Sequence, residues 1–365
     1  MYKRQGSSLL LLLLLQQWIG LSQAQAQNSS QQEDYQCFES REELLDAIDD
    51  GGFLDPNSNV SATYGYPIGS WCVDHVTNFS ELFSGSWVAP STFNESLDGW
   101  NTSSATTMKG MFEKAFNFNH PLSSFDTSRV TDMSRMFKGA YSFNQPLSSF
   151  DTSNVIDMTS MFEEASIFNQ PLPSFNTSNV RDMFAMFHYA EAFNQPLSFD
   201  TSSVTDMSEM FGGAYSFNQS LSSFDTSSVS HMSWMFNDAS DFDQPLSSFD
   251  TSSVTDMNSM FRGALNFNQL LSSFDTSKVV DMSSMFEGAS SFNQPLSSFD
   301  ASNVWNMAWM FYEASSFNQS LCSFATVFEG SNRTIETNEM FQGTSCPIQE
   351  DPTLNQTSMC HSCSD

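Results

Sequence analysis

Hydrophobic and polar positions follow one repeating pattern along most of the chain. A Met-Phe pair recurs at intervals of 25, 25, 25, 24, 25, 25, 25, 25 and 30 residues. The pairs begin at Met111, Met136, Met161, Met186, Met210, Met235, Met260, Met285, Met310 and Met340. Leu82-Phe83, 29 residues before the first pair, looks like a degenerate earlier copy. A fixed period of roughly 20–50 residues is typical of a solenoid with atypical terminal units.

Each unit predicts one short helix and one short strand. In the unit Leu122–Pro146, apolar residues at i, i+3, i+4 and i+7 predict one buried helix face, formed by Met133, Met136, Phe137 and Ala140. Thr131 or Asp132 is placed to cap that helix. A strand around residues 124–128 would point Phe125 and Thr127 inward and their neighbours Ser124, Asp126 and Ser128 outward.

The phenylalanines explain why units would stack. One unit cannot bury its apolar residues alone, whereas stacking places Phe125 on Phe150, Phe137 on Phe162 and Phe143 on Phe168. At ~2 kcal/mol or more for each buried ring, this burial opposes chain entropy strongly. We therefore interpret the 36 Phe of the 365-residue chain as core. The link Leu197-Ser198-Phe199 lacks one serine, which predicts a turn or bulge there.

The sequence of the repeats resembles that of a known family. Units such as FNQPLSSFDTSNV, residues 143–155, resemble those of BspA-type leucine-rich-repeat surface proteins of bacteria, protozoa and algae, and the resemblance covers roughly Ile68 to Phe341. The L-x-x-F-D-T-x-x-V spacing is similar to the leucine-rich-repeat strand, but has Thr127 at the sixth place and Val130 at the ninth. The resemblance implies a leucine-rich-repeat-like solenoid of about ten 25-residue coils. It also implies an extracellular or surface role in adhesion and protein binding without enzymatic activity.

The chain predicts four regions. Residues 1–26 resemble a secretory signal, with basic Lys3 and Arg4, the apolar run Leu9–Leu15 and a small-x-small cleavage site before Gln27. The alternative is an uncleaved anchor, for which the run is short against ~30 Å of hydrocarbon. Residues 27–67 form a polar leader and cap, with a helix predicted over Arg41–Asp49. Residues 68–341 form the stack, and residues 342–365 a Cys-rich tail.

Six cysteines outside the repeats fit an oxidising compartment and disulfide-stapled caps. Cys37 and Cys72 form the one pairing available before the array, whereas Cys322, Cys346, Cys360 and Cys363 allow three connectivities. A redox or zinc site at Cys360-His-Ser-Cys363 is disfavoured because the sequence shows no second ligand pair. The C-terminus carries no hydrophobic tail, which argues against a lipid-anchor signal.

Charge restricts the partners. The formal net charge is −30 at pH 7, and removing Lys3 and Arg4 with the leader makes it −32. Such a chain should repel nucleic acid and anionic membranes. Ten N-x-S/T sequons are candidate glycosylation sites in a secreted chain. We favour those at Asn28, Asn59, Asn78, Asn94, Asn101, Asn332 and Asn355; Asn318 is a further sequon, and stacked neighbours could block Asn176 and Asn218.

Polar residues form three rows along the array. The first Asp row follows the strand Phe and is broken by Asn176; it contains Asp126, Asp151, Asp200, Asp225, Asp250, Asp275 and Asp300. The second Asp row precedes the first helix Met and is broken by His231 and Asn306; it contains Asp132, Asp157, Asp182, Asp206, Asp256 and Asp281. Both rows could cap local turns. Alternatively, their repulsion of about 1–3 kcal/mol per neighbouring pair could favour calcium or a basic partner, although no EF-hand loop is present.

The third row and two tryptophans complete the candidate residues. The Asn row is expected to link coils through corner backbone groups, with recognition of sugar as the alternative; it contains Asn119, Asn144, Asn169, Asn194, Asn218, Asp243, Asn268, Asn293 and Asn318. Trp234 stands at an outward, variable position in mid-array and is a candidate partner contact. For Trp309, near the end of the array, packing against the C-terminal cap is expected.

No catalytic pattern emerges. The five histidines occupy unrelated repeat positions, and G-x-S-x-G, H-E-x-x-H and phosphate-loop motifs do not occur. We predict a secreted or cell-surface protein without cofactor or membrane insertion. It would recognise an extracellular protein or glycan through an acidic, Ser/Thr-rich face formed by the first Asp row, together with Trp234. The alternatives are a passive wall-associated protein ordered by calcium and, more remotely, a polysaccharide-acting enzyme.

Overall fold

The computed structural model describes residues 35–84, 92–324, 334–352 and 358–363. The chain divides into two compact units, Met1–Gln36 and Cys37–Asp365, and the second contains every element described below. The predicted signal, residues 1–26, lies outside the described residues. Among the described helices, none has the length and apolar character needed to cross a membrane.

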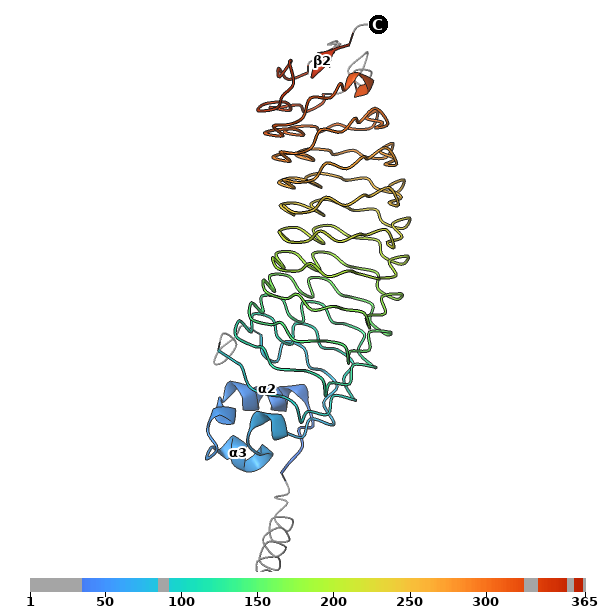
Figure 1. The fold of residues 1–365 in the computed structure, drawn as a ribbon. Coiled ribbons are helices and arrows are strands. Elements are labelled where there is room, and N and C mark those ends of the chain that lie inside the picture. The colour runs from blue at the N-terminus through green and yellow to red at the C-terminus, as the bar shows by residue number, and fades with distance from the viewer. Residues whose placement is uncertain (1–34, 85–91, 325–333, 353–357, 364–365) are drawn as a thin grey trace, which may run out of the picture. The chain divides into compact units, whose positions relative to one another are not determined.

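The second unit begins with a small helical cap (Figure 1). It contains α2 (Arg41–Asp49), the 3-10 helix η1 (Gly52–Leu54), α3 (Asn59–Tyr64) and the 3-10 helix η2 (Ile68–Ser70). The helix predicted over Arg41–Asp49 is confirmed. The Ser40 side chain accepts the N–H of Glu43 and so caps the first turn of α2.

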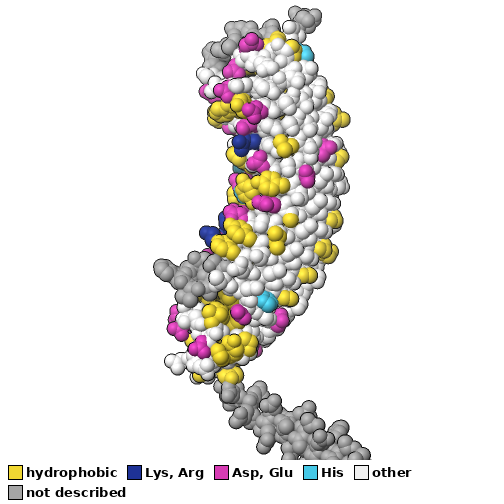
Figure 2. Space-filling model, turned by 60° about the vertical axis from the view of Figure 1, so that its left-hand side comes forward, with side chains coloured by type: hydrophobic (Ala, Val, Ile, Leu, Met, Phe, Trp, Pro, Cys, Tyr) yellow, Lys and Arg dark blue, Asp and Glu magenta, His cyan; other side chains and the backbone are white. Residues whose placement is uncertain are grey.

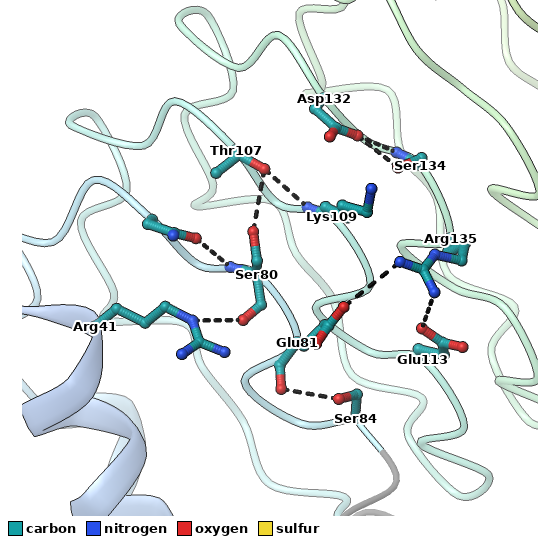
Figure 3. Close-up of polar contacts among 11 residues, drawn as sticks. Arg41, Ser80, Glu81, Ser84, Thr107, Lys109, Glu113, Asp132, Ser134 and Arg135 are labelled. Carbon is teal, nitrogen blue, oxygen red and sulfur yellow. Dashed lines mark hydrogen bonds and ion pairs between the residues drawn. The ribbon is translucent and has the colours of Figure 1, made fainter.

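Aromatic stacking and one disulfide fix this cap. Phe38 stacks on Tyr64 with ring centroids 4.0 Å apart, and the predicted Cys37–Cys72 disulfide is present. Arg41 of α2 donates from Nε to the Ser80 carbonyl at 2.8 Å, which ties the cap to the first coil (Figure 3).

The repeats form a stack of coils, each coil hydrogen-bonded to the next (Figure 1). Successive single-residue parallel bridges connect equivalent positions, namely Asn78, Thr107, Asp132, Asp157, Asp182, Asp206, His231, Asp256, Asp281, Asn306 and Glu336. The degenerate copy at Leu82-Phe83 belongs to this stack, because the Phe83 N–H donates to the Met111 carbonyl at 2.9 Å.

The predicted short helix is wrong, although its buried face is right. Met133, Met136, Phe137 and Ala140 are fully buried, yet residues 134–139 form linked turns. Alternate N–H groups bond locally to the residue three before them and, between these, to the next coil, as Arg135 does to the Thr159 carbonyl at 2.8 Å. An α-helix would point its N–H groups along its own axis, toward carbonyls four residues back, and not sideways to a neighbouring coil.

The predicted strand over residues 124–128 is also absent, although its alternation is right. Phe125 and Thr127 are buried, whereas Asp126 is exposed. The Phe125 N–H bonds locally to the Leu122 carbonyl at 3.1 Å. The link to the next coil runs instead through the Thr127 hydroxyl, which donates to the Asp151 carbonyl at 2.9 Å.

Phenylalanine columns fill the core as predicted. Phe137 and Phe162 have ring centroids 5.6 Å apart, and Phe143 and Phe168 are 6.0 Å apart. Within one coil, Phe137 and Phe143 face each other at 4.1 Å with nearly parallel rings. Offset stacks of this kind are favourable beyond their area burial. The one-residue deletion leaves Phe199 buried in its column. The turn predicted at that link is wrong, because residues 193–200 form no turn, whereas the intact coils turn there, as at Ser148-Ser149.

The Asn row links the coils as the sequence predicted. Asn169 accepts the backbone N–H of Asn194 on its Oδ1 at 3.0 Å, and Gln195 donates its Nε2 to the same oxygen at 3.0 Å. Asp243 makes both contacts in its own rung. A side-chain oxygen from each coil therefore satisfies the corner backbone of the next.

The C-terminal tail covers the last coils. It contains the antiparallel pair β1 (Ser358–Met359) and β2 (His361–Ser362). Of the three connectivities open to its cysteines, the structure has Cys322–Cys363 and Cys346–Cys360.

Candidate binding groove

The first Asp row serves local turns. The Oδ1 of Asp126 accepts the N–H of Ser128 at 3.0 Å and its hydroxyl at 2.6 Å. Asn176, which breaks the row, accepts the same two bonds from Ser178. These hydrogen bonds lower the pKa of Asp126, with the Ser128 hydroxyl as the largest cause. The row therefore has the geometry of Asx-turns, in which amide and carboxylate are interchangeable.

The second Asp row is half-buried and accepts similar bonds. Asp256 accepts the N–H of Asn258 at 2.9 Å. Burial raises the pKa of Asp256, and the nearby Asp281 adds to this. Asn306, one of the exceptions in this row, donates its Nδ2 to Asp281 at 3.0 Å.

Neither row forms a metal cluster in the part of the chain that the structure describes. No group of three or more His, Cys, Asp or Glu side chains in these ranges could hold a metal ion. The calcium interpretation of the rows gains no support from this geometry.

The linked turns carry the side chains that vary most between coils, and we name this surface the turn face. It consists of two rows of residues. One row precedes each Met-Phe pair and contains Gly110, Arg135, Ser160, Ala185, Glu209, Trp234, Ser259, Ser284, Trp309 and Glu339. The other row follows each pair and contains Glu113, Lys138, Glu163, His188, Gly212, Asn237, Arg262, Glu287, Tyr312 and Gln342. In Figure 2 the visible Lys and Arg side chains lie along one edge of the stack, among acidic and hydrophobic ones.

Ion pairs cross the coils at the N-terminal part of the turn face. Arg135 reaches back over two coils to Glu113 at 3.6 Å and Glu81 at 3.5 Å (Figure 3). Lys138 and Glu163 lie 2.7 Å apart. Burial opposes ionisation of Glu163, but the neighbouring His188 and the hydrogen bond from Lys138 outweigh it and lower its pKa to about 2.

A groove of about 600 Å³ lies on the C-terminal part of the turn face. Its lining includes Trp234, Trp309 and Tyr312, with Arg262 and Glu287 between them. Both tryptophans are exposed, Trp234 by 37% and Trp309 by 43%. The volume falls within the range of about 300–1,000 Å³ that is usual for ligand sites.

Polar contacts hold the groove in shape. The Arg262 guanidinium carbon lies 5.9 Å from the ring centroid of Trp234, a cation–π contact. The Nε of Arg262 also pairs with Glu287 at 3.1 Å. The backbone N–H of Trp234 donates to the carbonyl of Asn258, a groove residue in the next coil, at 3.0 Å.

The structure separates the two sets of residues that the sequence proposed together as a binding face. Trp234 is exposed, as its outward position suggested, and it lines the groove. None of the seven residues of the first Asp row lines the groove. The expected packing of Trp309 against the C-terminal cap is wrong, because this indole is exposed in the same groove. Its position in the same row as Trp234, three coils on, was the signal in the sequence.

A second hollow of about 480 Å³ was not predicted. It is lined by Tyr141, Glu164, Ser166, Tyr189 and Glu191. The hydroxyl of Tyr141 lies 3.3 Å from a Glu164 carboxylate oxygen. This second hollow is smaller than the groove, and no tryptophan lines it.

The favoured glycosylation candidates within the described residues are exposed, namely Asn59, Asn78, Asn94 and Asn101. Those at Asn28, Asn332 and Asn355 lie outside the described residues. Asn218 is half-buried, and its Oδ1 accepts bonds from Asp243 and Gln244.

A protein-family model matches most of the chain. The family described as "Mycoplasma protein of unknown function, DUF285" matches residues 57–175, 123–199, 197–272 and 244–351. The chain belongs to this family. The four overlapping DUF285 matches bear out a repeat protein, and the narrower resemblance to BspA-type proteins stays a prediction. Searches of the curated proteins and of the solved structures find no match to the chain.

Proposed function

We propose that this DUF285 protein is an exported recognition protein, a solenoid of the leucine-rich-repeat-like class that resembles BspA-type surface proteins. Its partner is an extracellular protein or glycan. The binding surface is the groove of the turn face around Trp234 and Trp309, rather than the first Asp row. The protein has no catalytic role in this proposal.

The disulfides support export. All six cysteines are paired, and no free cysteine occurs in the described residues. Disulfides of this kind persist in oxidising compartments. The sequence of residues 1–26 adds the predicted leader.

The observation that carries the binding proposal is the pair of exposed tryptophans in one groove. Trp is enriched among the residues that dominate binding energy, and an indole buries a large area at little entropy cost. Elsewhere in the same row the chain places small residues, such as Ser160 and Ala185, which are buried. The stack therefore forms without an indole at this position, and binding a partner accounts for the two that are present.

The local hydrogen bonds of the first Asp row argue against it as the main contact. One oxygen of Asp126, Asp200 and their equivalents accepts bonds from a serine two residues on. The row adds negative charge to a chain of net charge −30 and so disfavours polyanionic partners.

Binding of the disulfide-bonded chain to panels of extracellular glycans and proteins tests the proposal. We expect saturable binding to at least one member by the wild type. The double variant Trp234→Ala/Trp309→Ala should lose it, whereas Leu270→Ala should retain it, because Leu270 is 57% exposed but does not line the groove. Equal binding by wild type and double variant, or no binding to any member, would contradict the proposal.

A further inference from the structure

We propose that the groove between Trp234 and Trp309 binds a neutral oligosaccharide chain, with pyranose rings stacked on the two indoles. This inference rests on the proposed recognition function and names the class of its ligand. The two tryptophans occupy the same repeat position, three coils apart. At roughly 4.8 Å between neighbouring parallel segments, the indoles stand about 14 Å apart along the stack.

The backbone at this position makes a large side chain unusual. Trp234 and Trp309 have φ values of 60° and 57°, in the left-handed region. Bulky residues rarely adopt it, and such positions cluster at binding sites. Ser259 and Ser284, between the two indoles, hold the same conformation with φ values of 52° and 54°. Serine therefore satisfies the fold here, and the indoles are surplus to it.

Ser259 and Ser284 form the base of the groove between the two indoles. Ser259 is 4% exposed and Ser284 is half-buried, and both line the groove. A groove with an indole at each end and hydroxyls between them matches a sugar chain, whose rings present apolar C–H faces and hydroxyl edges. Trp is suited to such a contact because it combines an apolar face with a polar N–H.

An unpaired amide oxygen adds a polar contact for the ligand. The Oδ1 of Asn258 is buried and has no hydrogen-bond partner among the described residues, although Asn258 lines the groove. A buried acceptor left without a donor lowers the stability of the fold. Rotation of this amide toward the groove would let the oxygen accept a ligand hydroxyl and remove that cost.

The charges favour a neutral ligand. Arg262 is already paired with Glu287 and lies over Trp234, so neither charge needs a partner from the ligand. The remaining acidic groove residue is Glu339, which with the net charge of −30 disfavours acidic sugars. A basic peptide is the competing ligand for an acidic surface, and it forms one arm of the test.

Calorimetric titration of the full chain with neutral hexasaccharides, an acidic hexasaccharide and a Lys-rich hexapeptide tests the inference. We expect saturable binding of at least one neutral sugar, with a shift of tryptophan fluorescence. Trp234→Ala and Trp309→Ala should each weaken it at least tenfold. Trp305→Ala is the matched control, because Trp305 is 47% exposed but does not line the groove, and it should change the affinity less than twofold.

Two kinds of outcome would overturn the inference, one against the ligand class and one against the groove. Tighter binding of the basic peptide or of the acidic sugar, or the absence of binding by every neutral sugar, would exclude the ligand class. Sugar binding that persists in the double variant would exclude the groove. If no neutral sugar binds but the double variant still loses its partner from the extracellular panels, the glycan inference fails while the proposed recognition function stands.

Discussion

The hydroxyl of Thr127 donates to the carbonyl of Asp151 at 2.9 Å and accepts the N–H of the same residue at 2.8 Å. One buried side chain thus satisfies both polar backbone groups of a residue in the next coil. The contact recurs at Thr226 and Asp250, and at Thr276 and Asp300. Buried threonines, rather than a strand, join the coils along this side.

Thr127→Val should therefore destabilise the stack. Valine keeps the shape of the side chain but leaves the N–H and carbonyl of Asp151 unpaired, which costs about 2 kcal/mol. Thr127→Ser keeps the hydroxyl and should lose only about 1 kcal/mol for the missing methyl group. Urea unfolding followed by circular dichroism measures both losses, and a Val variant as stable as the wild type would contradict the role of the hydroxyl.

The contacts of the Asn row predict that two variants of Asn169 differ in stability. Asn169→Ala removes the acceptor of the Asn194 N–H and of the Gln195 amide, and should cost about 1–3 kcal/mol. Asn169→Asp retains the acceptor, as Asp243 does naturally, and should cost much less. Equal losses in the two variants would show that the oxygen does not link the coils.

Asp256 of the second row and Asp250 of the first row predict pH effects of opposite sign. Burial raises the pKa of Asp256 above its ordinary value of 3.8, so its contribution to stability is present below that value and is lost as pH rises through the raised pKa. Asp256→Asn keeps the acceptor for the Asn258 N–H and should raise the melting temperature at pH 7. The gain should vanish near pH 3.

Asp250 in the same coil is the matched comparison. Hydrogen bonds from the Ser252 hydroxyl and N–H lower its pKa below 3.8, so its contribution is present above that value and is lost as pH falls through the lowered pKa. Asp250→Asn should therefore lower the melting temperature slightly at pH 7. Shifts of the same sign in both variants would contradict this assignment.

Each ring of the phenylalanine columns should contribute strongly to stability. Phe236 is fully buried between Phe211 at 5.8 Å and Phe261 at 5.7 Å. Phe236→Ala should cost about 3–5 kcal/mol in urea unfolding. Leu265→Ala, at a position 47% exposed, should stay within about 0.5 kcal/mol of the wild type. A small loss for Phe236→Ala would mean that the columns do not form the core.

The effect of calcium on thermal stability distinguishes the recognition proposal from the alternative of a passive protein ordered by calcium. Because serine donors already occupy one oxygen of each first-row Asp, as at Asp126, we expect millimolar calcium to leave the melting temperature unchanged. Differential scanning calorimetry with calcium and with a chelator measures this. Stoichiometric binding with a raised melting temperature would support the passive alternative.

Burial was readable from the sequence, but the backbone that produces it was not. Met133, Met136 and Phe137 share one side both in a helix and in a run of linked turns, so their spacing predicted the core and suggested the wrong element. The turns depend on bonds to carbonyls 24 residues on and on a left-handed φ of 58° at Arg135. Neither has a local signature, since arginine does not favour that conformation.

The candidate site was half readable for a similar reason. The outward position of Trp234 followed from the repeat, and so did that of Trp309, but proximity to the C-terminal cap suggested cover that the tail does not give. The groove exists because the small residues Ser259 and Ser284 lie between the two indoles on the surface of the stack. The sequence reveals this arrangement only when the register of the coils is known. The second hollow, around Tyr141 and Tyr189, depends on the same register.

Equivalent residues of successive coils lie in register at the spacing of parallel chain segments, and this register places the two indoles in one groove. Spin labels at cysteines replacing Ser123 and Ser272, both exposed and six coils apart, test it by pulsed electron paramagnetic resonance. We predict a narrow distance distribution near 29 Å, six steps of roughly 4.8 Å. A distance above about 50 Å, as for coils packed through helices roughly 9 Å apart, or a broad distribution without a peak, would contradict the account.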